Sequence, residues 1–118
     1  MTPFGQKLRD LRAERGLSLK DMAAGLGVSP AYLSALEHGH RGKPNRRFVH
    51  QVCQLFGIIW DDAEALQALA DRSHPRVVVD TADLSPEATE LANLLAEKIG
   101  DLPEETVERW LGELKETA

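Results

Sequence analysis

Residues 16–39 of the chain read GLSLKDMAAGLGVSPAYLSALEHG, and they contain two short helical patterns. In the first pattern, Ser18-x-x-Asp21 is typical of a capping box at the start of a helix. In the second, Ser29 precedes Pro30, and proline is tolerated at the first helical position because its missing N–H is not needed there. Gly27 permits the positive φ that a tight turn between two helices requires. The stretch therefore predicts two helices joined by the turn at residues 26–29.

Amphipathic patterns flank this stretch on both sides. We expect a helix at about residues 3–15, with Gly16 at its end, and later helices at about 46–56 and from Asp61 to about residue 70. Two more helices are expected, one from Ser85 to Gly100 and one opened by the Asp101-x-x-Glu104 pattern. The intervening linker can hold a short strand at Val77–Val79, since β-branched residues favour strands. The prediction is an all-α fold, with a five-helix domain at 1–72 and a linker plus two-helix appendage at 73–118.

The charges divide sharply along the chain. Residues 1–60 hold nine Lys and Arg against four Asp and Glu, a net charge of +5, whereas residues 61–118 hold five against fifteen, a net charge of −10. An asymmetry of this kind favours a polyanionic partner for the basic half. The net charge of −5 for the whole chain therefore does not argue against nucleic acid.

Composition and motifs also exclude several classes of protein. The 118 residues are 42% hydrophobic and suit a globular chain, with no apolar run long enough to span a membrane and no signal-peptide core. We therefore expect a cytoplasmic protein. The lone Cys53 cannot form an intramolecular disulfide and is interpreted as a buried apolar residue. His38 and His40 lack further spaced metal ligands. No catalytic constellation is evident, so we expect no enzyme, no metal and no cofactor.

The two central helices and their turn form a helix-turn-helix signature. Ala23 is small enough for the helices to cross closely, and the outward face of the third helix carries short side chains that suit the DNA major groove. At residues 16–39 the sequence resembles the phage-repressor-like (Xre/Cro-type) helix-turn-helix family almost position for position, and the resemblance extends over roughly residues 3–70. It departs at Leu19, where the family often has Gln. Either Lys20 replaces that backbone contact or Leu19 packs in the core.

The resemblance implies a sequence-specific regulator that binds double-stranded DNA with the third helix in the major groove. Pro30 and Ala31 can offer only apolar contacts, for instance to thymine methyl groups, so polar readout depends on their neighbours and on DNA shape. Arg41 is the best candidate to enter a groove. The arginines of the first helix are expected to form a solvated face. The expected DNA-binding residues are Lys20, Ser29, Pro30, Ala31, Tyr32, Ser34, His38, His40, Arg41, Lys43, Asn45, Arg46 and Arg47.

The acidic half carries apolar stripes that two short helices cannot bury by themselves. Family members usually bind near-palindromic sites as dimers, so the resemblance implies a homodimeric repressor that occludes a promoter. The expected dimerisation residues are Val77, Val78, Val79, Leu91, Leu95, Trp110, Leu111 and Leu114. Packing of this region on the first domain is an alternative. So are an antitoxin whose acidic tail covers a toxin, a helix-turn-helix module that binds a protein partner, and an activator.

Overall fold

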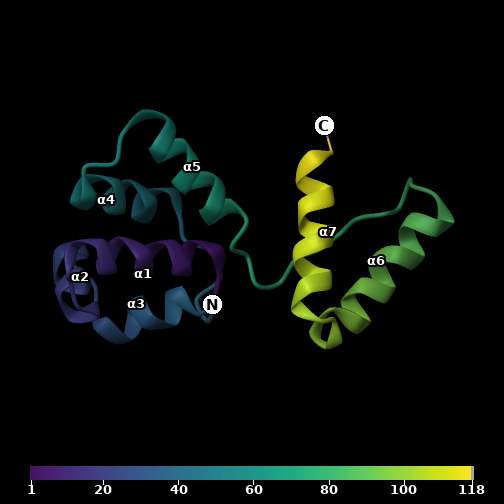
Figure 1. Cartoon of the computed structure of the whole chain (residues 1–118), viewed down its shortest axis with the longest axis horizontal. Coiled ribbons are helices and arrows are strands. Elements are labelled where there is room, and N and C mark those ends of the chain that lie inside the picture. The colour runs from purple at the N-terminus through teal and green to yellow at the C-terminus, as the bar shows by residue number, and fades with distance from the viewer. Residues whose placement is uncertain (118) are drawn as a thin grey trace. The chain divides into compact units, whose positions relative to one another are not determined.

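The computed structural model describes residues 1–117, which divide into two compact units, Met1–Val77 and residues 78–117. The first unit is a bundle of five helices (Figure 1). Its helices are α1 (Pro3–Arg15), α2 (Leu19–Leu26), α3 (Pro30–Glu37), α4 (Arg46–Phe56) and α5 (Trp60–Asp71). The second unit contains α6 (Pro86–Lys98), a 3-10 turn at Ile99–Asp101 and α7 (Glu104–Glu116). The predicted all-α fold is confirmed.

The ends of the first four helices follow from local sequence. The Ser18 side chain accepts a hydrogen bond from the backbone N–H of Asp21, and the Asp21 carboxylate accepts one from the Ser18 N–H, so the predicted capping box is present. These bonds lower the pKa of the exposed Asp21 carboxyl below its ordinary value, chiefly through the Ser18 backbone N–H. Gly27 ends α2 with φ of 71°. α5 begins at Trp60, one residue before the expected start, and its N-cap Ile59 provides no side-chain hydrogen bond.

The core of the first unit is aliphatic, with three phenylalanines. α2 packs against α3 and α4, α1 packs against α3 and α5, and α4 packs against α5. Phe4 and Phe48 meet edge to face, with their ring centroids 6.2 Å apart. Cys53 is buried, as expected. The buried apolar residues are Phe4, Leu8, Leu11, Met22, Ala23, Leu26, Leu33, Leu36, Phe48, Val49, Val52, Cys53, Phe56, Leu66 and Ala70.

The end of α3 is clamped to α1 through Glu37. Its side chain is 2% exposed and forms an ion pair with Arg12 of α1. Its backbone carbonyl oxygen accepts a hydrogen bond of 3.0 Å from the Thr2 N–H. Gly5 lies so close that a Cβ there would stand 2.2 Å from the same oxygen, so only glycine fits at this crossing without movement. Glu37 therefore fixes the position of α3 by both its side chain and its backbone.

The expectation of a solvated arginine face on α1 is wrong for Arg12, whereas Arg15 is exposed but also bonds to a neighbouring helix. Arg12 forms the ion pair with Glu37. Arg15 donates a hydrogen bond of 2.9 Å to the Phe56 carbonyl oxygen, and its guanidinium lies 5.3 Å from the Phe56 ring centroid. Both side chains tie α1 to another helix because the neighbouring helices supply acceptors that a single-helix pattern does not reveal. Arg9 is exposed, as expected.

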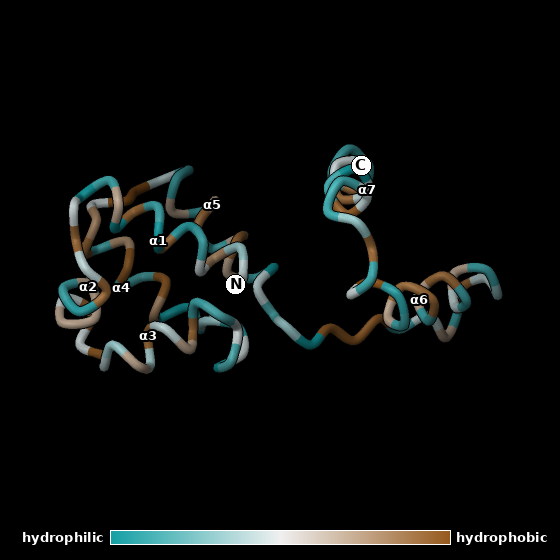
Figure 2. Tube along the Cα trace, turned by 60° about the horizontal axis from the view of Figure 1, so that its bottom comes forward, coloured by the Kyte–Doolittle hydropathy of each residue, from teal (hydrophilic) through white to brown (hydrophobic). Residues whose placement is uncertain are grey.

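The second unit departs from the sequence predictions in three ways. Residues 77–79 form no strand, since no backbone among the described residues pairs with them, and Val78 is 93% exposed. Figure 2 shows this hydrophobic stretch as extended chain before α6. α6 ends at Lys98, where the 3-10 turn follows, and not at Gly100 as the sequence predicts. α7 has Pro103 as its N-cap, with no side-chain cap from Asp101.

Neither α6 nor α7 buries any residue. The first turn of α6 is nonetheless locally ordered, because the Ser85 hydroxyl caps this helix by accepting from the Ala88 N–H at 3.1 Å. The hydroxyls of Thr81 and Thr89 bond to one another at 2.8 Å. No helix within residues 1–117 is long and apolar enough to cross a membrane. Local bonds shape this unit, and its apolar side chains stay in solvent.

We predict that Arg12→Ala lowers the free energy of unfolding by about 3–5 kcal/mol, since removing one partner of a buried pair leaves the other charge uncompensated. The measurement is urea denaturation followed by helical circular dichroism. The control is Arg12→Met with Glu37→Gln, which removes both charges and should recover part of the loss. A loss below about 1 kcal/mol in Arg12→Ala would contradict the importance of the clamp.

Candidate nucleic-acid interface

α3 has a well-defined outer face because the residues of its inner face are buried in the core of the first unit. Leu33, Leu36 and Glu37 are buried, whereas Pro30 and Ala31 are exposed. The N-terminal half of the helix therefore offers small side chains to solvent. A surface of this shape approaches a DNA groove closely, but it supplies few side-chain donors.

A hydrogen-bonded turn continues this face beyond α3. The N–H of Gly39 donates to the Leu36 carbonyl oxygen at 3.2 Å, and the N–H of His40 donates to that of Ala35 at 2.9 Å. These two bonds form a Schellman motif, in which Gly39 adopts φ of 82°. The loop after α3 is consequently anchored to the helix at its first residues.

The two histidines of this loop lie beside one another. The His38 ring bonds through Nδ1 to the Ser34 carbonyl oxygen at 2.9 Å, and its centroid lies 6.2 Å from that of His40. The residues from 1 to 117 contain no group of three or more His, Cys, Asp or Glu side chains placed to hold a metal ion. Both imidazoles are exposed next to α3.

Arg41 turns back over the start of α3. Its guanidinium carbon lies 5.2 Å from the centroid of the Tyr32 ring, within the range of a cation–π contact. Tyr32 is half-buried and packs against the core, while Arg41 is exposed. The structure thus joins two predicted site residues that are nine positions apart in the sequence.

A second group of cations lies between the loop and α5. The Lys43 ammonium is 3.4 Å from the Asp71 carboxylate, with both side chains substantially exposed. The pKa of Asp71 is lowered, first by a hydrogen bond from Gln67 and then by Lys43 and the charge of Arg46. Solvent screens an exposed pair of this kind, so it contributes little to stability and Lys43 can exchange it for another anion.

All thirteen predicted DNA-binding residues reach the surface. Eleven are exposed, and Tyr32 and Ser34 are half-buried. Lys20 is exposed in the first turn of α2, and its neighbour Leu19 packs against the core. The expected packing of Leu19 is therefore confirmed, and Lys20 stays a predicted DNA-binding residue.

Two of the thirteen residues also cap helices. The Ser29 hydroxyl caps α3 by accepting from the Tyr32 N–H at 3.0 Å. The Asn45 side-chain oxygen caps α4 by accepting from the Phe48 N–H at 2.8 Å. The sequence pattern places Ser29 directly before the first helical position, but Asn45 is predicted only as one of the DNA-binding residues. Asn followed by an amphipathic run is the signal that indicates a cap there.

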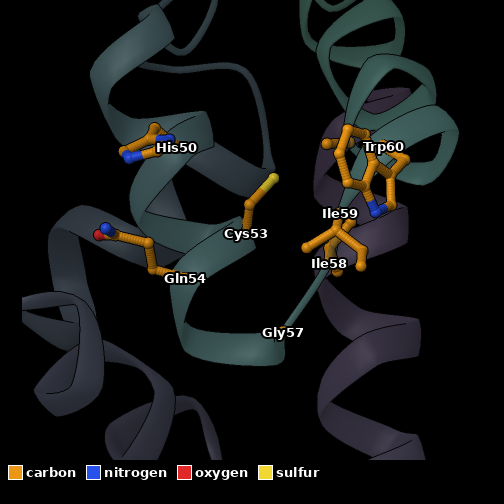
Figure 3. Close-up of a pocket in the computed structure, with 8 residues that line it drawn as sticks. His50, Cys53, Gln54, Gly57, Ile58, Ile59 and Trp60 are labelled. Carbon is orange, nitrogen blue, oxygen red and sulfur yellow. The ribbon is translucent and has the colours of Figure 1, made fainter.

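The groove between α4 and the start of α5 lies on another part of this unit. It has a volume of about 450 Å³ and is lined mostly by apolar groups, with Ile59 and Trp60 on one side and α4 on the other (Figure 3). Trp60 is 82% exposed and has φ of 56°. The Cys53 side chain points from α4 toward this segment, and burial raises the pKa of its thiol. His50 and Gln54 of α4 are the polar residues that line the groove.

Comparison with known proteins establishes the class. A family model described as a helix-turn-helix domain matches residues 3–68. This match spans more than half of the chain and includes α1 to α4 and most of α5. The protein therefore belongs to this helix-turn-helix domain family.

Several curated proteins are similar to the chain. RghRB of Bacillus subtilis (strain 168), named an uncharacterized HTH-type transcriptional regulator, is 34% identical over 65 residues, or 55% of this chain and 47% of that protein. The HTH-type transcriptional regulator DdrOP3 of Deinococcus deserti is 36% identical over 80 residues, 67% of this chain and 61% of that protein. The HTH-type transcriptional regulator SinR of Bacillus subtilis is 29% identical over 71 residues, 60% and 59% respectively. The chain thus spans about half to three fifths of these relatives. No solved structure gave a significant match.

We predict that Ser29→Ala and Asn45→Ala each lower the free energy of unfolding by about 1 kcal/mol, because each leaves a helix N–H without its side-chain acceptor. Thermal unfolding followed by circular dichroism measures the effect. Ser34→Ala is the matched control, since its hydroxyl caps no helix, and its stability should stay within about 0.5 kcal/mol of the parent. Equal stability of all four proteins would show that neither side chain acts as a cap in solution.

Proposed function

We propose that the chain is a sequence-specific regulator of transcription that binds double-stranded DNA through its first unit, with α3 in the major groove. The observation that carries the proposal is the succession of exposed residues along one stretch of chain. It begins with the small residues at the start of α3, continues with the cation of the anchored loop and ends with the arginines that open α4. The family membership and the names of the relatives support the same function.

The proposed contacts divide into two kinds. Pro30 and Ala31 make apolar contacts to base edges, such as thymine methyl groups, while Ser34 and Arg41 supply polar ones. The phosphate backbone is bound by the remaining cations, Lys20, Lys43, Arg46 and Arg47, with further hydrogen bonds from His38 and His40. The first turn of α4 adds backbone N–H groups and the positive end of the helix dipole. Phosphate contacts set the position of the domain, and the base contacts select the sequence.

The second unit is proposed to pair with its copy in another chain. The apolar residues of α6 and α7 are exposed, among them Leu91 at 66% and Leu111 at 49%. Covering such side chains contributes about 1.5–3 kcal/mol each on full burial, and a second copy offers the same apolar surface. A dimer presents two copies of α3 to a near-palindromic operator. Occupation of that site by two DNA-binding units would repress transcription by blocking a promoter.

The DNA contacts are tested with Arg41→Ala combined with Arg46→Ala. The probe is a duplex that the parent chain selects from a random-sequence library. We expect at least about a tenfold loss of affinity in fluorescence anisotropy, and a shallower dependence of log affinity on log salt, since fewer counterions are released. Arg109→Ala with Lys115→Ala removes the same charge from the second unit and serves as control. Equal loss in both double variants would show that only total charge matters, and unchanged binding would refute the assigned contacts.

Dimerisation is tested with Leu111→Asp, which places a charge on the exposed apolar face of α7. We expect light scattering on the eluting protein to report about twice the 13.0 kDa chain mass for the parent and a single chain for the variant. Ile59→Asp is the control, because Ile59 is also exposed but belongs to the first unit. A monomeric parent would refute the homodimer. A dimeric Leu111→Asp protein would place the interface elsewhere.

A further inference from the structure

We infer that Tyr32 is a positioning residue, which holds the Arg41 guanidinium in its DNA-contacting orientation before DNA arrives. The inference rests on the proposed DNA-binding function. It states that the Tyr32 ring and the Arg41 guanidinium are already in contact before DNA binds. It gives Tyr32 a role different from the direct base or phosphate contact that the sequence suggests.

The backbone around Arg41 is already restricted on both sides. On its N-terminal side, the His40 N–H is bonded to the Ala35 carbonyl oxygen at the end of α3. On its C-terminal side, Gly42 adopts φ of 74°, a conformation that other residues rarely take. The main freedom left to Arg41 is therefore in its long side chain. An unrestrained arginine loses considerable rotamer freedom when it binds.

The Tyr32 ring provides the restraint for this side chain. It is held by the core on one side and stands 5.2 Å from the guanidinium carbon on the other. No carboxylate within the described residues pairs with Arg41, whereas Lys43 in the same loop has Asp71. The aromatic ring is thus the group that determines where this cation lies.

A guanidinium that lies over an aromatic ring keeps its binding capacity. The attraction acts between the positive charge and the face of the ring, and it does not require a hydrogen bond from the guanidinium N–H groups. Those donors can therefore serve a phosphate oxygen or a base edge. The contact lowers the entropic cost of binding DNA without replacing the hydrogen bonds that make the DNA contact.

The role of the ring is separated from that of the hydroxyl by two substitutions. Tyr32→Phe keeps the ring, and Tyr32→Leu keeps an apolar side chain without it. On the duplex selected by the parent chain from a random library, we expect Tyr32→Leu to weaken binding about two- to fivefold, the range of an exposed cation–π contact. Tyr32→Phe should match the parent. The slope of log affinity against log salt should stay unchanged in both, since the number of charges is unchanged.

A double-mutant cycle with Arg41→Ala shows whether the ring acts through this arginine. Once Arg41 is absent, Tyr32→Leu should cause no further loss. A loss that persists in the Arg41→Ala background would overturn the inference, as would a Tyr32→Phe protein as weak as Tyr32→Leu. If Tyr32→Leu fails to fold, as judged by helical circular dichroism, Tyr32→Met takes its place in the cycle.

Nuclear magnetic resonance of the DNA-free protein gives an independent measurement. Tyr32 is the only tyrosine in the chain. Its ring should shift the side-chain protons of Arg41 upfield, and the shift should persist in Tyr32→Phe and vanish in Tyr32→Leu. Absence of the shift in the parent would overturn the inference. Failure of the parent to select any duplex would instead refute the proposed function, so the two failures are distinguishable.

Discussion

The attachment of α3 to α1 at Glu37 is the constraint on which the rest of the first unit depends. The carboxylate pairs with Arg12 in a site closed to solvent, and the carbonyl oxygen of the same residue bonds to the Thr2 N–H. Gly5 allows the two segments to approach closely. A buried charge accepts few alternative positions, because any displacement from its partner leaves it without solvation. This junction therefore sets the rotation of α3, and with it the residues that face outward.

The loop after α3 takes its position from the same junction. Glu37 is the last residue of α3, and the Schellman bonds to Gly39 and His40 follow directly. Arg41 then lies over Tyr32 at the other end of the helix. The proposed interface is thus a rigid helix with an attached cationic loop. The buried ion pair between Glu37 and Arg12 sets the position of both. A surface that is ordered before binding loses less conformational entropy on contact with DNA.

The two units differ in how they gain stability as well as in charge. The first has an aliphatic core, while α6 and α7 bury no side chain, and only α6 has a side-chain cap. Under the proposed function, the acidic residues of the second half would reduce non-specific attraction to DNA. The exposed leucines of the second unit are the physical basis for proposing a second copy. One unit thus suits a polyanion and the other suits an apolar surface.

Local sequence alone determined where the first four helices begin and end. Ser18, Ser29 and Gly27 act within a few residues of themselves, so their effects do not depend on the rest of the fold. Tertiary structure decided which polar residues are buried. Arg12 and Glu37 each follow a buried leucine by four residues, at Leu8 and Leu33, but their pairing joins two helices. Tertiary structure also left Val77–Val79 without a strand partner and placed Arg41 next to Tyr32. Capping is a short-range interaction, whereas burial, ion pairing and strand formation each require a second segment.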